Sequence, residues 1–394
     1  MNQRVIVVGA GPVGLATALT LATRGVAVQV LEKRDGLSQA SRASTFHAPT
    51  LDMLDDLGVL APVAALGRRV DEIQYSRCTP GKAALAARFR LAALAGATRH
   101  PYRLHLEQSR LTPLLLDAVL AHPGCAVRFG AEMTGLVQDD QGVTVRVRRG
   151  ALIESMRASW LVGADGANSS VREAAGIAFK GEDYDKRVLR VMTTTDLARV
   201  IPGLAGISYL HAGDESISLL AMPEVWRMII RLPAMVDDDT ALGYRFIVRQ
   251  LRSFLPVACD LPLASTDIYR VSQRVASAYR AGRVLLAGDA AHVTNTRGGM
   301  NMNCGLHDAR VLGGALADAM RGDATALDRY ARTRRAVATD ELIPRTERAV
   351  SAGSDRLDEL AAIAADPRRA FDFMRRAAML DIAPAAGVTT GERA

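Results

Sequence analysis

The chain has 394 residues, of which 49% are hydrophobic and 23% charged, and its formal net charge is +7. This length allows two domains, and this composition excludes a chain that is disordered throughout. The arginines are scattered among alanine and leucine and form no basic block, so the charge favours anionic small ligands over a nucleic-acid partner.

Targeting and redox features of the sequence are sparse. No apolar run reaches the roughly 18 residues that a membrane span needs, and the N-terminus shows no signal-peptide pattern. The cysteines are few and widely spaced: Cys78, Cys125, Cys259 and Cys304. This spacing is not that of a disulfide framework or a cysteine metal site. We therefore expect a cytoplasmic protein, without a metal or a membrane span, as a monomer or homodimer.

The N-terminal elements predict a parallel sheet. Residues 4–8 (RVIVV) have the pattern of a buried strand, residues 13–24 follow with helical periodicity, and residues 26–32 (VAVQVLE) predict a second strand. Parallel strands joined by a helix are typical of a doubly wound α/β sheet.

The middle of the chain changes character. The stretch of residues 50–63 is expected to form a helix that ends at Gly58, and a second helix is expected at residues 110–122. Alternating apolar and polar residues around the turn DDQG then predict strands joined by hairpins. Residues from about 180 to 275 continue as a mainly antiparallel second region.

The C-terminal part returns to the first pattern. The segment GRVLLAGDAAH, residues 282–292, predicts another parallel strand, and residues 305–350 are helical. The tail after about residue 388 is expected to fray.

A glycine motif joins the first strand to the first helix. Gly9 allows a tight turn, Gly11 lets the backbone approach a pyrophosphate, and Gly14 allows close packing of helix on strand. The helix N-terminus favours the anion. Glu32, followed by Lys33, ends the second strand where a carboxylate accepts from ribose hydroxyls. An unliganded tight turn is the alternative interpretation.

Two further strands run into acidic residues. LVGADG ends at Asp165 and Gly166, and RVLLAGD ends at Asp289. Ligands bind at the carboxyl ends of strands in open α/β sheets, so both acids are candidate ligand contacts. Each acid alone could instead be a helix N-cap.

With these motifs in this order, residues from about 4 to 320 resemble the single-component FAD-dependent aromatic hydroxylases, the group of para-hydroxybenzoate hydroxylase. The resemblance implies that Arg42 contacts the FAD pyrophosphate region, that Gln108 and Asp289 lie near the ribityl chain, and that the motif of Asp165, Gly166 and Arg172 serves FAD and NAD(P)H. It also implies that the segment GGMNMNCG, beginning near Gly299, brings the amides of Met302 and Asn303 to the flavin N1–C2=O edge.

The resemblance also implies a reaction and a domain plan. NADH or NADPH reduces FAD, oxygen forms a flavin C4a-hydroperoxide, and a hydroxyl group passes to an aromatic or heteroaromatic, phenol-like substrate. The FAD-binding, Rossmann-like domain would comprise residues 1–75, 100–178 and 276–350. A mixed or antiparallel substrate domain would comprise residues 76–99 and 179–275, with C-terminal helices in 351–394. That last segment leaves no room for a further thioredoxin-like domain.

The chain departs from the family pattern at two positions. The family usually has Pro where this chain has Thr296 and Gly where it has Asn301. Asn tolerates positive φ better than other non-glycine residues, so Asn301 is expected to keep the glycine conformation. Thr296 is the candidate catalytic departure, because its hydroxyl could contact the substrate or the peroxide.

Candidates for catalysis and substrate binding are less specific. His292 lies near the flavin motif, or caps a turn, and His47 could face the active site. Four residues of the second region are candidate substrate contacts, in two alternating pairs that each share one face of a strand: Tyr209 with His211, and Arg227 with Arg231. Trp226 is expected in a core or on a sheet surface.

Three alternatives stay open at this point. An antibiotic-modifying flavin hydroxylase would use the same chemistry, and a flavin-binding protein with lost or altered turnover would keep the same motifs. An ordinary NAD dehydrogenase leaves the Gly-Asp motif unexplained. A flavin-dependent halogenase is disfavoured, because Trp160 and Trp226 lie far apart and form no Trp-x-Trp motif.

Overall fold

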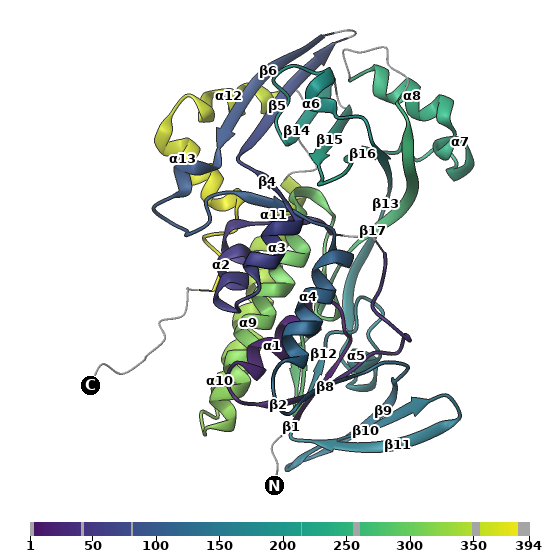
Figure 1. Ribbon diagram of the computed structural model, residues 1–394, viewed down its shortest axis with the longest axis vertical. Coiled ribbons are helices and arrows are strands. Elements are labelled where there is room, and N and C mark those ends of the chain that lie inside the picture. Colours follow the sequence, from purple (N-terminus) through teal and green to yellow (C-terminus); the bar gives the residue numbers. More distant parts are fainter. Residues whose placement is uncertain are drawn as a thin grey trace.

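The computed structural model describes residues 4–40, 43–79, 82–213, 215–254, 261–348 and 355–384. Arg42 and the tail after residue 388 lie outside these ranges. Among the described residues, no helix is long and apolar enough to cross a membrane. Two large sheets divide the molecule, one in the lower half of Figure 1 with long helices beside it and one in the upper half.

The first sheet has six strands and contains the N-terminal unit. Its strands, in spatial order, are β18 (Arg280–Ala281), β19 (Val284–Leu286), β12 (Trp160–Gly163), β1 (Arg4–Val8), β2 (Ala27–Leu31) and β8 (Cys125–Arg128). The pairs from β19 to β8 are parallel, and β18 is antiparallel at one edge. The predicted parallel sheet is therefore confirmed, including the late return of the chain at β19.

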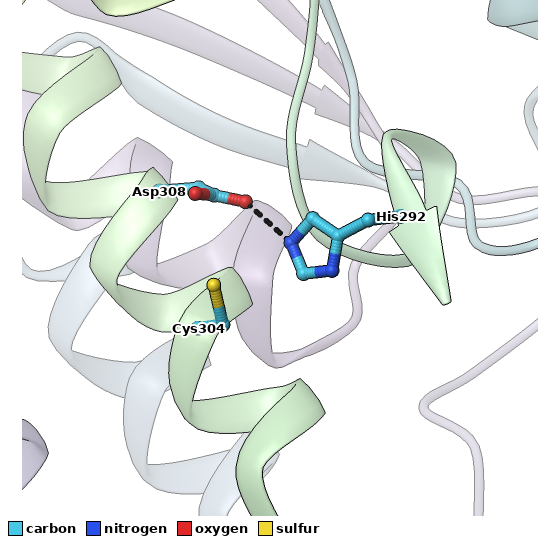
Figure 2. Close-up of side chains that lie close together, drawn as sticks. All are labelled: His292, Cys304 and Asp308. Carbon is cyan, nitrogen blue, oxygen red and sulfur yellow. Dashed lines mark hydrogen bonds and ion pairs between the residues drawn. The ribbon is translucent and has the colours of Figure 1, made fainter. Parts of the chain in front are cut away.

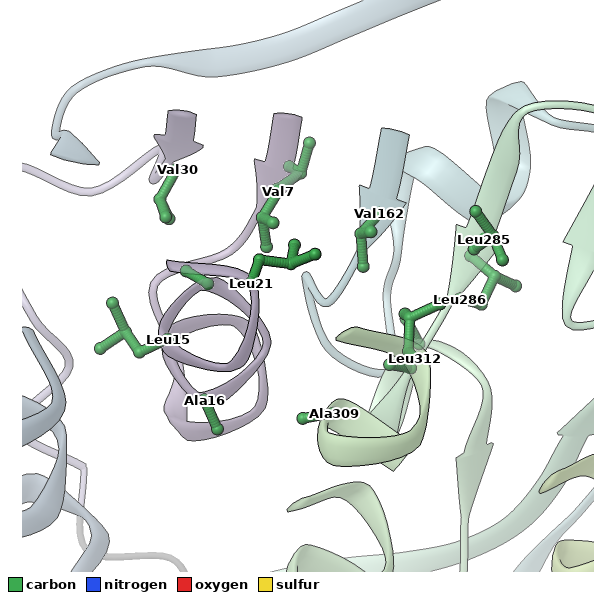
Figure 3. Close-up of a cluster of buried hydrophobic side chains, with 14 of the residues drawn as sticks. Val7, Leu15, Ala16, Leu21, Val30, Val162, Leu285, Leu286, Ala309 and Leu312 are labelled. Atoms are coloured by element: carbon green, nitrogen blue, oxygen red, sulfur yellow. The ribbon is translucent and has the colours of Figure 1, made fainter. Parts of the chain in front are cut away.

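Helices cover this sheet because its strands are apolar on both faces. Val7, Val30 and Val162 are fully buried, and α1 (Pro12–Ala22) and α9 (Met300–Met320) lie side by side below them (Figure 3). A Cβ atom at Gly313 of α9 would lie 2.6 Å from the Cγ2 atom of Thr20 in α1. The two helices approach closely only because this position is glycine.

The second sheet has eight strands. In spatial order they are β20 (His292–Val293), β17 (Leu263–Ala276), β13 (Phe179–Thr193), β16 (Trp226–Arg231), β15 (Glu215–Ala221), β14 (Ile207–Ala212), β5 (Glu72–Thr79) and β6 (Lys82–Arg90). The pairs are antiparallel except β14 with β5, which is parallel. The predicted antiparallel second region is confirmed, and the sheet also contains β5 and β6 from residues 72–90 and β20 from residues 292–293.

One face of this sheet forms a core with short helices. Leu189, Leu219, Met228 and the almost fully buried Trp226 belong to that core. Trp226 is therefore a core residue, as expected from the sequence. The helices near this region are α6 (Leu197–Val200), α7 (Asp238–Leu242) and α8 (Tyr244–Arg252).

Smaller elements complete the fold. The predicted hairpins are β9 (Glu132–Asp139), β10 (Gly142–Arg149) and β11 (Leu152–Ala158), and a second small sheet contains β3 (Thr45–Phe46), β7 (Arg103–His105) and β4 (Arg68–Val70). The remaining helical segments are α2 (Ala48–Asp56), α3 (Leu60–Leu66), η1 (Leu91–Leu94), α4 (Gln108–Leu120), α5 (Ser170–Ala174), η2 (Gly288–Ala290), η3 (Arg297–Gly299), α10 (Ala326–Ala336), η4 (Val337–Leu342), α11 (Ile343–Arg348), α12 (Asp355–Ala364) and α13 (Pro367–Ala377).

Two of these segments bear on the sequence predictions. The helix expected at residues 50–63 is two helices, α2 and α3, separated at Gly58, whose φ is 74°. The C-terminal helices α12 and α13 pack against β5, β6 and η1 through Leu357, Leu360 and Met374. They lie beside the upper sheet in Figure 1.

Candidate functional site

A large cavity is lined by both sheets. Its volume is about 1560 Å³, and its lining includes the glycine turn after β1, the loop before α9 and residues of β14, β15 and β16. Ligand pockets for drug-sized molecules usually have about 300–1,000 Å³. The cavity is therefore large enough for a dinucleotide together with a small aromatic molecule.

The glycine turn has the geometry that a dinucleotide needs. Gly9 has a φ of 105°, and a Cβ atom at Gly14 would lie 1.9 Å from the carbonyl oxygen of Gly9. A Cβ atom at Gly11 would meet no protein atom within 4 Å. Gly14 thus serves the packing of α1 on β1, whereas Gly9 and Gly11 line the cavity.

The acid at the end of β2 is built into the same turn. The Glu32 carboxylate accepts hydrogen bonds from the backbone nitrogen of Ala10 at 3.0 Å and of Arg34 at 3.1 Å. Glu32 and Lys33 both line the cavity, as does Gln108 at the start of α4. The carboxylate is held beside the glycine turn, with lone pairs left for ribose hydroxyls.

Hydrogen bonds of Asp165 and Arg172 hold the Asp-Gly motif after β12 in place. Asp165 lines the cavity and also accepts hydrogen bonds from Ser169, Ser170 and the backbone nitrogen of Val171, but the N-cap of α5 is Ser169 and not Asp165. Burial raises its pKa despite these donors. Arg172 donates to the carbonyl oxygens of Ala290 at 3.0 Å and Ala167 at 2.8 Å, so it ties the Asp-Gly motif to the Gly-Asp motif.

The loop before α9 owes its shape to two glycines. Gly298 and Gly299 have φ values of 74° and 64°, and Gly299 is the N-cap of α9. The Asn303 side chain donates to the carbonyl oxygens of Gly299 at 2.7 Å and Thr45 at 2.8 Å. Asn303 is fully buried behind the cavity, while Met302 lines it. The Asn303 side chain therefore joins the loop before α9 to β3, which the sequence did not predict.

The expectation for Asn301 is wrong. Among the described residues the only non-glycine residue with positive φ is Met379, and Asn301 lies in the first turn of α9. Its side-chain nitrogen donates to Asp289 Oδ1 at 2.8 Å, and its oxygen lies 3.1 Å from His292 Nδ1. Asn301 does not replace a left-handed glycine, because Gly298 and Gly299 already provide that conformation. It connects the cavity residue Asp289 to the interior.

The protonation of His292 follows from this connection. The Asp289 carboxylate faces the Asn301 amide nitrogen, so the amide oxygen faces His292, and Nδ1 must donate. The other ring nitrogen lies 2.8 Å from Asp308 Oδ2, so it donates too. Burial alone would lower the pKa of His292, but Cys304 and Asp308 outweigh it and raise that pKa well above its usual value. Both contacts and the raised pKa favour the imidazolium form of the buried His292.

His292 faces the helix rather than the cavity. Figure 2 shows its ring pointing toward Asp308 of α9, with Cys304 one turn earlier. These three residues could offer ligand atoms to a metal ion, since the atoms lie within 4.8 Å of one another. However, Arg334 already donates to Asp308 at 2.6 Å and to Cys304 Sγ at 3.2 Å, which places a fixed cation beside the cluster. We interpret His292 as a positioning residue, not as a residue that touches substrate.

His47 is also a supporting residue. It is fully buried, is absent from the cavity lining, and precedes α2 as its N-cap. Its Nε2 lies 2.9 Å from the Gly298 carbonyl oxygen, and its backbone nitrogen donates to Asn303 Oδ1 at 3.0 Å. The expectation that His47 faces the active site is not supported, because its side chain supports the loop before α9 from behind.

Thr296 does line the cavity. Its hydroxyl lies 3.3 Å from the hydroxyl of Tyr269 on β17, and its carbonyl oxygen accepts from the Gly299 nitrogen at 3.3 Å. Thr296 therefore joins the loop before α9 to the eight-stranded sheet by a side-chain contact that proline could not make.

The four candidate substrate residues share one face of the eight-stranded sheet. Tyr209, His211, Arg227 and Arg231 all line the cavity. Arg227 is nearly buried and donates to Ser44 at 2.6 Å and to Glu107 at 3.1 Å; burial, with the charge of Arg190, lowers its pKa to about 10. Residues that the sequence reasoning missed complete this face, namely Tyr75, Arg190, Ser218, Ile229, Asp267 and Tyr269. Strand alternation would have indicated Ile229, because it lies midway between Arg227 and Arg231 and so shares their face of β16. Ile229 pairs with Arg190 of the neighbouring strand β13.

These features define a class of protein: a dinucleotide-binding sheet joined to an antiparallel substrate sheet around one cavity. The family model described as "FAD binding domain" matches residues 2–342. The chain is 32% identical over 340 residues to para-nitrophenol 4-monooxygenase of Pseudomonas sp. strain WBC-3, covering 84% of this chain and 83% of that protein.

Solved structures agree with this comparison. The p-nitrophenol 4-monooxygenase PnpA from Pseudomonas putida superposes with a TM-score of 0.85 at 28% identity, over 95% of this chain and 99% of that chain. An aklavinone-11 hydroxylase in complex with FAD and aklavinone has a TM-score of 0.76 at 29% identity, over 91% and 70% of the two chains. The chain belongs to the FAD binding domain family, and it is an FAD-dependent monooxygenase.

Proposed function

We propose that this enzyme hydroxylates a phenol-like aromatic or heteroaromatic small molecule, with NADH or NADPH as the electron donor and molecular oxygen as the second substrate. The observation that carries the proposal is that one cavity is lined on one side by Gly9, Gly11 and Glu32 and on the other by the polar inner face of β14, β15 and β16. FAD and a small aromatic substrate would therefore fit in the same cavity.

The chain's residues would divide the work as follows. The glycine turn would bind the pyrophosphate, Glu32 and Lys33 the adenosine side, and Gln108 and Asp289 the ribityl chain. Asp165 and Gly166 would border the cofactor, and Gly299 with the first amides of α9 would face the flavin pyrimidine edge. Helix N-terminal amides stabilise negative charge there. Bound FAD would supply electron transfer from NAD(P)H and the activation of oxygen.

The protein would position and enclose the ring. Tyr209, His211, Arg227 and Arg231 would contact the substrate from the sheet, and Thr296 would approach it from the loop before α9. The α12–α13 pair adds Leu360, Ile363 and Phe373 to the lining, which helps to exclude water. An antibiotic-type aromatic substrate is the second candidate, because the aklavinone-11 hydroxylase shares this architecture.

Steady-state oxidation of NADH and NADPH tests the proposal. Purified, FAD-loaded enzyme is given phenols, hydroxybenzoates and hydroxypyridines, and the products are identified by mass spectrometry. We expect at least one compound to stimulate oxidation and to gain one oxygen atom. If every compound binds without stimulating oxidation, the enzyme assignment gives way to a flavin-binding protein without turnover.

We further propose a cytoplasmic location, and a monomeric or homodimeric state. A cytoplasmic location fits the use of NAD(P)H and the free thiols of Cys78, Cys125 and Cys304.

A further inference from the structure

The C-terminal helices sort their charges between the cavity and the outside. Residues 341–381 contain seven arginines and eight acidic residues, so the segment as a whole is close to neutral. Among the side chains that the structure describes, six of these arginines line the cavity, but the lining acids of this segment are only Glu341, Asp372 and Asp381. The six arginines, which we call the arginine rim, are Arg345, Arg348, Arg356, Arg369, Arg375 and Arg376. The cavity face of α11, α12 and α13 is therefore positive, although the segment has a slight excess of acids.

Helical periodicity produces this sorting. In α13 the lining residues Arg369, Asp372, Phe373 and Arg376 are three or four positions apart in successive turns, which places them on one side of the helix. Arg368 belongs to the same helix, but it is exposed and is not among the lining residues. The lining residues of α12 have the same spacing. The positive face is therefore encoded in the sequence of these helices.

Part of the arginine rim is used inside the protein, and part is available to a ligand. Arg345 donates to Asp381 at 2.8 and 2.6 Å and to Glu341 at 2.7 Å, so it holds the segment after α13 in place. Arg369 and Arg376 are exposed, and within the described ranges their guanidinium groups form no hydrogen bond or ion pair. Their forks of donors match phosphate oxygens, and their exposure allows a ligand to leave after each turnover.

The arginine rim lies next to the start of α9, where the flavin pyrimidine edge would be bound. Met300, the first residue of α9, packs against a cluster that contains Leu342 before α11 and Met379 after α13. Arg103 of β7 donates to the carbonyl oxygen of Ala377, the last residue of α13, at 3.0 Å. Met300, Arg103 and Ala377 all line the cavity. A ligand bound at the rim would therefore share one cavity with the flavin.

We propose that the arginine rim binds the pyrophosphate of NADH or NADPH while the nicotinamide reaches the flavin. The chain has one GxGxxG turn, which the proposed function assigns to FAD, so the electron donor needs another anion-binding surface. The rim complements the phosphate charges of a nicotinamide dinucleotide, and a positive face also speeds the encounter with an anionic partner. This inference rests on the proposed function, and it gives the electron donor a docking site.

Anaerobic reduction of the FAD-loaded enzyme tests the rim, because stopped-flow absorbance gives the Kd for the donor separately from the limiting rate of reduction. We expect Arg369→Gln and Arg376→Gln together to raise the Kd for NADH or NADPH about tenfold, and each alone to act in the same direction. The limiting rate should not change, since the rim holds the pyrophosphate and not the nicotinamide. Titration with NAD⁺ or NADP⁺ should give the same order of affinities without electron transfer, and salt should weaken donor binding more in the wild type than in the double variant.

Arg368→Gln is the matched control, because it removes the same charge from the same helix outside the cavity lining. It should leave the Kd for the donor unchanged, and all variants should keep their affinity for FAD. Equal weakening by Arg368→Gln and Arg376→Gln would mean a general charge effect and would rule out the rim, as would a double variant with unchanged donor binding. Weaker binding of 4-hydroxybenzoate in the double variant, with donor binding intact, would assign the rim to an anionic substrate and overturn the proposal as well.

The rim and the proposed function fail in different ways. A wild-type enzyme that is reduced by the donor but forms no hydroxylated product would overturn the proposed hydroxylation and leave the rim in place. Reduction with the same Kd in the wild type and the double variant would overturn only the rim. If neither NADH nor NADPH reduces the flavin, the electron donor of the proposed function is wrong, and the rim proposal is wrong with it.

Discussion

At the residue scale, Asn301 is the point where the cavity meets a buried ion pair. Its amide donates to Asp289 and accepts from His292, which in turn donates to Asp308. The directions follow from the two ends of this chain, because the carboxylates of Asp289 and Asp308 accept hydrogen bonds and the groups of Asn301 and His292 that face them must donate. Asp289 is therefore oriented from behind by a chain of hydrogen bonds that ends at the Arg334 guanidinium.

A double-mutant cycle tests this chain. Asn301→Ala removes the side-chain amide without placing a glycine in α9, and Asp289→Ala removes the carboxylate that this amide contacts. Each should raise the Kd for FAD by about tenfold, and together they should show a coupling free energy of about 1–2 kcal/mol, because each change removes the same charge-assisted hydrogen bond. Fluorescence titration of the apoenzyme with FAD gives the four affinities. Strictly additive effects would show that Asn301 does not orient Asp289.

The contact of Thr296 with Tyr269 gives a second residue-scale prediction. Thr296→Val and Tyr269→Phe each remove one hydroxyl of a 3.3 Å contact that joins the loop before α9 to β17. We expect both variants to release more hydrogen peroxide per NAD(P)H consumed, since a looser loop admits water. Comparing product formed with NAD(P)H consumed measures this coupling. Unchanged coupling in Thr296→Val and in Thr296→Pro would remove Thr296 from the catalytic machinery.

At the element scale, the strand–turn–helix unit of β1 and α1 separates two uses of glycine. Gly14→Ala would press a methyl group against the Gly9 carbonyl oxygen, 1.9 Å away, so it should lower the free energy of unfolding by about 2–3 kcal/mol. Gly11→Ala meets no protein atom, and its φ of −77° suits alanine. We expect an unchanged Tm for the Gly11→Ala apoenzyme and at least a tenfold weaker affinity for FAD. Loss of apoenzyme stability in Gly11→Ala would contradict this division.

The sequence predicted elements better than side-chain partners. The parallel strands, the hairpins and the antiparallel region follow from local periodicity, and the structure confirms them. Asn301 was misassigned because conformational preference is local, whereas its partners Asp289 and His292 come together only through the folded loop. Arg297 was overlooked for the same reason: nothing near it in the sequence indicates Arg231, which reaches the same site from β16.

At the scale of the whole molecule, charge gathers where the two sheets share the cavity. The net charge of +7 gives no location by itself. In the fold, Arg231 and Arg297 lie on the substrate side, whereas Glu32, Asp165 and Asp289 lie on the side of the glycine turn. Lys33 and Arg34 also line the end with the glycine turn, and Asp267 lines the end with the eight-stranded sheet, so both ends of the cavity carry charges of both signs.

Acid sensitivity is the expected global consequence of the buried histidines. His105 and His307 have pKa values lowered to about 3, and His211 to about 4, mainly by burial, and the pKa of His47 is also lowered well below its usual value. In the unfolded chain each would bind a proton near pH 6.5. Because the folded pKa values are depressed, folding releases these protons, and stability is lost as pH falls below about 6.5.

The size of this effect can be measured. Each such histidine contributes up to about 1.4 kcal/mol per pH unit below 6.5, so these four would lower the free energy of unfolding by about 5 kcal/mol between pH 7.5 and pH 5.5, and the net loss is about 4 kcal/mol once the opposite effect of His292 is included. His292 acts oppositely: its raised pKa gives stability that is complete below its unfolded value and is lost as pH rises through the folded value. Urea unfolding across this range measures the slope. His105→Gln, which keeps a donor for the Ala221 carbonyl oxygen, should reduce it by about one proton. An unchanged slope in that variant would mean that His105 takes up its proton in the folded enzyme, contrary to its burial.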